Sequence, residues 1–208
     1  GHQVSEPTRE SVMALLQDRG WPIQYPAIVA LRDTSIGADV WGEWLCALTA
    51  DGFMACIGTT DPGAAPMAGT GHIRVNPHGV ARIPEGFVLD LFYPGFHGDG
   101  GRNTDHPCWR QCDGQFGTKA LPILIERWQH EEWMAITHPA VGPFNFHRAL
   151  MRGASRRVGD FSHGCLVVRL LIDHWRMCLL LGYPEHGPTP EQMATMRCSL
   201  YLIDITPE

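Results

Sequence analysis

Turn-forming residues punctuate this chain from end to end. Its 208 residues include 23 glycines and 16 prolines. Both residue types interrupt helices and favour turns, so we expect a mainly β protein with a few helices, of the α+β class, and not a helical bundle. A chain of this length can bury one substantial core. We therefore expect a single domain over residues 28–208, with residues 1–27 as an N-terminal helical segment packed on it.

Apolar runs between the turns predict most of the regular elements. Strand-like composition is found at residues 28–32, 40–49, 53–59, 86–93, 121–128 and 199–205. Helices are predicted at residues 8–19, 166–182 and 190–197. Thr8 is a candidate cap of the first helix, and Gly182 is the expected stop of the second.

Residues 95–118 are predicted to be an insertion loop that covers the active-site cleft, because long loops on a β scaffold commonly carry recognition. The stretch contains His97, His106, Cys108 and Cys112, which are potential zinc ligands. Their spacing lacks the paired Cys-x2-Cys framework of recognisable zinc sites, so no metal is predicted. No cofactor is predicted either.

The charge pattern excludes some partners. The chain has 22 acidic and 16 basic residues and no basic block, which argues against nucleic acid as the main partner. No apolar run has the length of a membrane span, and the N-terminus does not resemble a signal peptide. Seven cysteines are an odd number, so at least one is unpaired. We expect that one to be Cys165 and the others to be core residues.

The stretch from residue 143 to 168 carries the strongest chemical signal. Alternation of Phe144 and Phe146 with polar neighbours predicts a strand that ends near His147. Residues 162–164 predict a turn, and the leucines that follow predict a helix that opens at or just after Cys165. A thiol attacks carbonyls as its thiolate, which a nearby imidazole or the N-terminus of a helix favours.

These residues resemble a known signature. His147, then fourteen residues, then Ser162-His163-Gly164-Cys165 and an aliphatic residue is similar to the motif of the L,D-transpeptidase (YkuD-type) family. Enzymes of that family cut and rejoin peptidoglycan stem peptides through a cysteine acyl-enzyme. A weaker likeness, from Thr59 to Gly63, is to cysteine proteins of this superfamily encoded by phages and bacteria.

The resemblance implies a fold and a set of roles. Cys165 would be the nucleophile and His147 its base, while Ser162, His163 and Gly164 would shape the site and its oxyanion pocket. The implied fold is an L,D-transpeptidase-like β-sandwich with the catalytic cysteine at a strand/turn–helix junction. The chain departs from the family pattern at two positions, with Arg148 after the first histidine and Val167 two residues after the cysteine.

The segment between the two motifs is rich in arginine. Arg148, Arg152, Arg156 and Arg157 suit the carboxylates of a stem peptide, and Asp160 is a further candidate for substrate binding. A solvated loop explains the same arginines equally well, so both interpretations stay open.

Two functional hypotheses follow. The first is a cysteine acyltransferase or peptidase that acts on stem peptides in the periplasm or cell envelope, as an antibacterial effector or phage lysis protein with an immunity or delivery partner. Because histidine precedes cysteine, papain-like peptidases, which have the opposite order, are disfavoured. The alternative is a non-catalytic β-domain that binds cell-wall glycan or a protein partner, with Cys165 buried.

Overall fold

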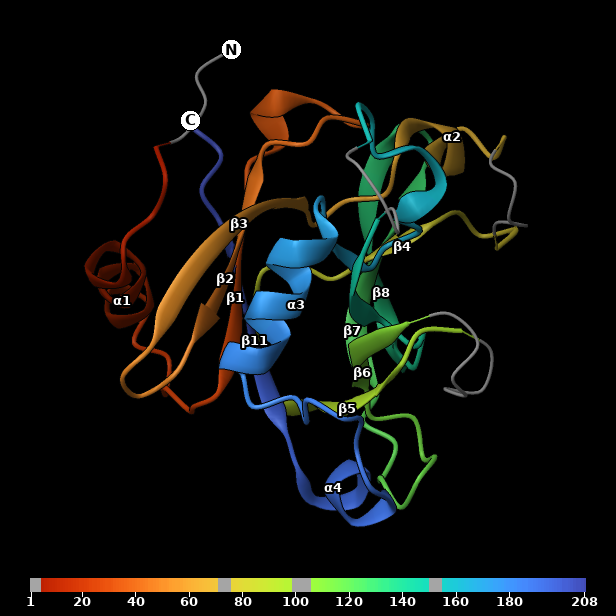
Figure 1. Cartoon of the computed structure of the whole chain (residues 1–208). Coiled ribbons are helices and arrows are strands. Elements are labelled where there is room, and N and C mark those ends of the chain that lie inside the picture. The colour runs from red at the N-terminus through yellow and green to blue at the C-terminus, as the bar shows by residue number, and fades with distance from the viewer. Residues whose placement is uncertain (1–4, 71–75, 99–105, 150–154) are drawn as a thin grey trace.

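The computed structural model describes residues 5–70, 76–98, 106–149 and 155–208, without the side chains of Thr137 and Asp160. Eight strands form a closed barrel in the order β1-β11-β5-β6-β9-β10-β3-β2 (Figure 1). Their bounds are Ala27–Arg32 (β1), Glu43–Leu48 (β2), Phe53–Thr59 (β3), Gly86–Phe96 (β5), Pro107–Gln111 (β6), Asn145–Arg148 (β9), Leu166–Val168 (β10) and Cys198–Asp204 (β11).

A second sheet of three strands, β4-β7-β8, stands beside the barrel. Its strands are Ala81–Arg82 (β4), Ile123–Gln129 (β7) and Glu132–Ala140 (β8). The helices are Arg9–Asp18 (α1), Ala64–Met67 (α2), Leu171–Leu180 (α3) and Pro190–Thr195 (α4), with 3-10 turns at Thr34–Ile36 (η1) and Gly159–Phe161 (η3). No helix in the described part of the chain is long and apolar enough to cross a membrane.

The mainly β, α+β class predicted from the turns is confirmed. The expected division into the two sheets of a sandwich is not evident, because eight of the strands pair into one closed ring. Closure leaves no unpaired edge in that sheet, which is one way in which β proteins avoid edge-to-edge association.

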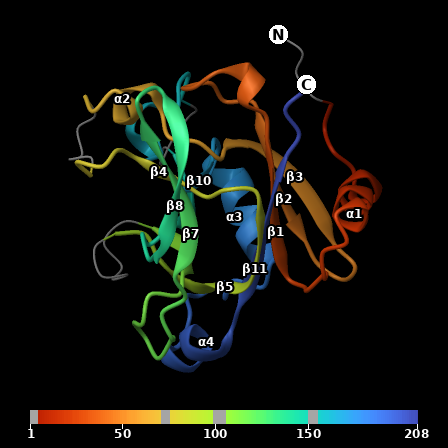
Figure 2. The same cartoon turned by 180° about the vertical axis from the view of Figure 1, so that it is seen from behind.

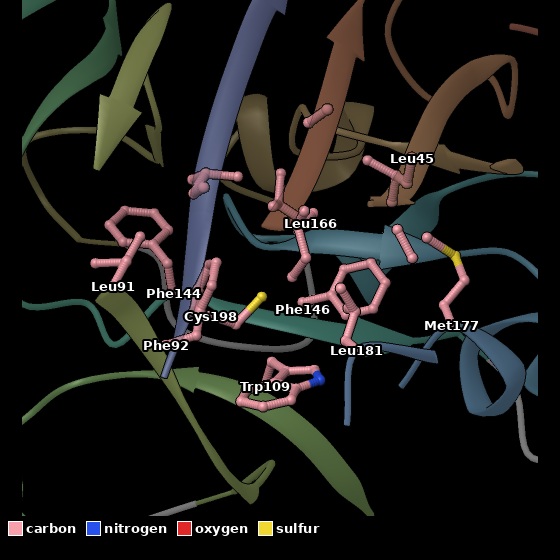
Figure 3. Packing of buried hydrophobic residues seen from close by; sticks show 14 of the residues in the cluster. Leu45, Leu91, Phe92, Trp109, Phe144, Phe146, Leu166, Met177, Leu181 and Cys198 are labelled. Carbon is pink, nitrogen blue, oxygen red and sulfur yellow. The ribbon is translucent and has the colours of Figure 1, made fainter. Parts of the chain in front are cut away.

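The main core lies inside the barrel and against the second sheet. Trp109, Phe146 and Leu166 are buried there, together with Met177 of α3 and Leu181, which caps that helix (Figure 3). Burial of a large apolar side chain contributes about 1.5–3 kcal/mol, so this cluster supplies a large part of the folding free energy. It also holds β9 and β10, which carry the candidate site, against a rigid support.

The N-terminal helix packs on the outside of the barrel (Figures 1 and 2). Val12 and Leu16 of α1 are buried against the outward-facing side chains of β1, β2 and β11. Thr8 caps the helix as predicted, since its hydroxyl accepts a hydrogen bond from the backbone N–H of Ser11 at 3.1 Å. Gly20 follows at φ 64°, a conformation that favours glycine at a helix end.

The predicted insertion at residues 95–118 is in part a barrel strand. Residues 107–111 form β6, which pairs with β5 on one side and with β9 on the other. Trp109 of this strand is fully buried in the core. The expectation of a loop throughout was wrong because the short run Pro-Cys-Trp-Arg-Gln has no clean alternation, and only its barrel neighbours make it a strand.

The helix predicted to open at Cys165 begins later. Leu166–Val168 form strand β10, and α3 starts at Leu171. Two adjacent valines favour a strand, and all three residues of β10 are buried between β3 and β9. The helix predicted from the leucine spacing therefore starts too early, because strand β10 stands between Cys165 and the first residue of α3.

Candidate active site around Cys165

The turn before Cys165 is shaped by its own side chains. The hydroxyl of Ser162, which is fully buried, accepts the backbone N–H of Gly164 at 3.3 Å and donates to the carbonyl of Cys165 at 3.0 Å. Gly164 has φ 119°, and a Cβ built there would lie 2.2 Å from the carbonyl oxygen of Ala81. Only glycine combines that conformation with that close approach.

Two neighbouring segments hold this turn in place. The backbone N–H of Gly63 donates to the carbonyl of Ser162 at 3.1 Å. On the other side, the carboxylate of Asp39 accepts the backbone N–H of Gly159 at 2.6 Å. The turn is therefore fixed by contacts from residues 39 and 63, far away in the sequence.

Cys165 is the least buried of the seven cysteine residues. All seven cysteines are free, and six of them are buried, whereas Cys165 is partly exposed. Its Sγ accepts the backbone N–H of Asn145 at 3.4 Å. Burial nevertheless raises the pKa of the Cys165 thiol to about 11, against the lowering effects of the Asn145 N–H and the charge of Arg110. The resting side chain is therefore a neutral thiol.

The expected help from a helix dipole is absent. The prediction of Cys165 at a strand/turn–helix junction was wrong, because β10 follows it and α3 begins six residues later. Cys165 is therefore not part of the first turn of α3, to which the dipole effect is largely confined.

His147 lies on the strand next to Cys165. Strand β10 pairs in parallel with β9, with Val167 opposite His147. Because side chains alternate along a strand, Cys165 and His147 lie on the same face, in diagonal positions. No hydrogen bond joins these two side chains in the structure; the described donor to Sγ is the Asn145 backbone.

The tautomer of His147 follows from its hydrogen bond. Its Nδ1 lies 2.9 Å from the carbonyl oxygen of Arg148. A carbonyl can only accept, so Nδ1 carries the proton and Nε2 keeps its lone pair. Burial, followed by the neighbouring His97 and His106, lowers the pKa of His147 well below its usual value. His147 is therefore a neutral imidazole with one proton-accepting nitrogen.

His147 belongs to a cluster of four histidines. Its ring centroid lies 4.4 Å from that of His97 and 5.6 Å from that of His106. His106 in turn lies 6.0 Å from His174, whose pKa burial lowers to about 3. In the sequence, His97 and His106 belong to the predicted insertion, and nothing there indicated that they lie beside His147. Among the described residues, no group of three or more candidate side chains is arranged to hold a metal ion.

Arg110 is a site residue that the sequence did not indicate. It lies on β6 directly opposite Asn145, and its buried guanidinium pairs with Asp113 at 3.0 Å. Its charge is one of the two influences that lower the pKa of Cys165. The available signal was an arginine beside a tryptophan in a stretch that we interpreted as a loop.

The predicted substrate-binding residues differ in their exposure. Arg148 ends strand β9 and is buried, whereas Arg156 and Arg157 are exposed. Arg152 lies outside the described residues, and so does the side chain of Asp160. His163 is partly exposed within the turn.

The chain matches no protein-family model and no curated protein sequence.

Proposed function

We propose that the chain is a cysteine-dependent enzyme that modifies peptidoglycan stem peptides, as an L,D-transpeptidase or as an L,D-carboxypeptidase or endopeptidase. The observation that carries the proposal is the setting of Cys165. It is the one partly exposed cysteine of seven, it follows a turn that only glycine at position 164 can form, and it shares a face with a neutral histidine. The likeness to the YkuD-type motif supplies the substrate class.

The proposed reaction starts from neutral partners. As Sγ of Cys165 forms a bond to a peptide carbonyl carbon, the thiol proton passes to Nε2 of His147. The backbone N–H of Cys165 stabilises the oxyanion, an effect of a few kcal/mol for a donor, whereas the N–H of Gly164 is held by the Ser162 hydroxyl. His147 then protonates the leaving amine as the C–N bond breaks. The acyl group passes next to an amine, which completes transpeptidation, or to water, which completes hydrolysis.

The neutral resting state sets a requirement on the substrate. A pKa of about 11 for Cys165 and a lowered pKa for His147 mean that a preformed thiolate–imidazolium pair is unfavourable. Proton transfer must therefore accompany attack, and the substrate must complete the alignment of the two side chains. Diagonal neighbours on adjacent strands lie about 7–8 Å apart, within reach of long side chains.

The same observations favour a second candidate. A neutral thiol without a hydrogen bond to His147 is also what a non-catalytic β-domain would contain. Such a domain would bind cell-wall glycan or a protein partner. The two candidates differ in whether Cys165 is chemically required.

The deciding experiment is mass spectrometry of muropeptides from purified sacculi after incubation with the protein. Cross-linked, exchanged or trimmed stem peptides should appear with the wild type and with Cys56→Ala, which removes a buried cysteine remote from the turn. They should be absent with Cys165→Ala. An unchanged profile for every variant would favour the binding domain.

We propose the periplasm or cell envelope as the site of action, with an antibacterial or lytic role. Expression directed to the periplasm should arrest growth of a test bacterium, and cytoplasmic expression should not. Cys165→Ala should be harmless in both compartments. Absence of toxicity from the wild type in both compartments would count against an effector and against the need for an immunity partner.

A further inference from the structure

A pocket of about 400 Å³ lies beside the segment that leads to Cys165, and α2, β4, β7 and β8 contribute to its lining. This volume is typical of sites for small ligands. Neither Cys165 nor His147 lines it, so it is separate from the proposed catalytic side chains. Its lining includes carboxylates (Asp33, Asp39, Glu43, Asp61, Asp204), two indoles (Trp128, Trp133) and apolar side chains (Ile36, Val40, Met67).

In each of the four aspartates, Oδ1 already accepts a hydrogen bond or forms an ion pair within the protein. Oδ1 of Asp33 accepts the backbone N–H of Ser35 at 3.0 Å, and Oδ1 of Asp204 accepts that of Thr206 at 2.9 Å. The corresponding oxygens of Asp39 and Asp61 bind Gly159 and the guanidinium of Arg32. The Oδ2 atoms accept no hydrogen bond from the residues that the structure describes. One oxygen of each carboxylate thus remains for a ligand.

One of the two indoles in the lining already contacts a cation. Trp128 and Trp133 face each other across β7 and β8, with ring centroids 5.3 Å apart. The guanidinium of Arg82 lies 4.3 Å from the Trp133 ring, while its Nε contacts Glu126 at 2.6 Å. In this protein, an indole with a carboxylate beside it therefore already binds a cationic group.

The charge of the lining is unbalanced. Five acidic side chains face one basic side chain, Arg82. Arg32, which is not part of the lining, lies 3.1 Å from Asp61 and offsets one further charge. The negative charge also affects Glu43. The pKa of Glu43 is raised to about 7, first by burial and then by the charge of Asp61. A ligand with positive charge would relieve this repulsion.

We propose that this pocket binds a ligand with a primary ammonium group on an aliphatic stem. The ammonium donates to the free aspartate oxygens and lies against the indole of Trp128, which Arg82 does not cover. The stem packs on Ile36, Val40 and Met67, so amine and methylene groups are recognised together. This site goes beyond the proposed reaction at Cys165 and does not depend on it.

The proposal is tested by calorimetric titration of Cys165→Ala protein with 1,5-diaminopentane, with 1,5-pentanediol as the neutral probe of matched length. The diamine should bind at one site and the diol at least tenfold more weakly. Asp33→Asn with Asp204→Asn keeps both Oδ1 acceptors and removes two charges, and should weaken diamine binding about tenfold or more. Trp128→Leu should weaken it several-fold.

Asp51→Asn, an exposed change in the β2–β3 turn, is the matched control and should leave the affinity unchanged. Thermal unfolding of each variant shows whether weaker binding comes from the altered side chain or from loss of the folded structure. Equal binding of diamine and diol, no binding of either, or full affinity in the double asparagine variant would overturn the proposal. Because the titration uses Cys165→Ala, these outcomes are independent of the muropeptide result.

Discussion

Alkylation of Cys165 as a function of pH tests how the proposed nucleophile is held. Its pKa of about 11, two units above an ordinary value of 9.0, means about a hundredfold less thiolate at pH 7. A more basic thiolate is also more nucleophilic, which recovers about a factor of ten over two units. We therefore expect Cys165 to react with iodoacetamide at least about tenfold more slowly than an exposed thiol of pKa 9.0.

The assay maps the alkylated cysteines by mass spectrometry after timed reaction of the native protein between pH 6 and pH 11. The rate at Cys165 should rise about tenfold for each pH unit up to pH 10, and the six buried cysteines should react more slowly still. Arg110→Met should move the profile to higher pH, because the guanidinium lowers the pKa of this thiol. Protein unfolded in guanidinium chloride supplies the reference, in which all seven cysteines become reactive.

A plateau of the Cys165 rate below pH 8 would refute this reasoning. It would mean that the thiolate is stabilised in the resting protein, as in a preformed pair with a protonated His147. The pH at which the alkylation rate reaches its plateau does not depend on how exposed the side chain is. Exposure multiplies the rate by the same factor at every pH and leaves the midpoint of the profile unchanged.

Two further changes test the supports of the site. Gly164→Ala should cost about 3 kcal/mol or more in the free energy of unfolding, since its Cβ would clash with the Ala81 carbonyl; Gly187→Ala, also at positive φ but with open space around it, should cost about 1–2 kcal/mol. Urea unfolding compares the two, and equal costs would argue against the clash. Glu43→Gln tests the buried carboxyl, whose pKa of about 7 in the folded protein exceeds its ordinary value of 4.5. Such a group contributes stability below pH 4.5 and loses it as pH rises through 7, so the variant should gain about 3 kcal/mol relative to the wild type between pH 4.5 and pH 8. A difference that stays constant over that range in urea midpoints would contradict the raised pKa.

Local features of this protein could be predicted from the sequence. Thr8 and Gly20 bound α1, and the final strand lies where its alternation predicted it. The turn at residues 162–164 was also expected, because caps, glycines and alternation act between residues close in the chain. The same local signals identified Cys165 and His147 as candidates.

The barrel and the environment of the thiol were decided by the tertiary structure. Strand β10 replaced the predicted helix start because β3 and β9 offer it partners on both sides. The pairing of β6 with β9 brings Arg110 opposite Asn145, the residue whose N–H contacts Cys165. None of these partners is near in sequence, and pairing between distant strands depends on closure of the whole ring.

The sequence by itself determined which residues could do chemistry and which local turn presents the thiol. Only the tertiary structure decided that the thiol is neutral, that the neutral His147 belongs to a cluster of four histidines, and that an acidic pocket lies beside the turn. The physical reason is that burial and electrostatic fields are sums over neighbours from many segments, whereas a turn or a cap needs only a few consecutive residues.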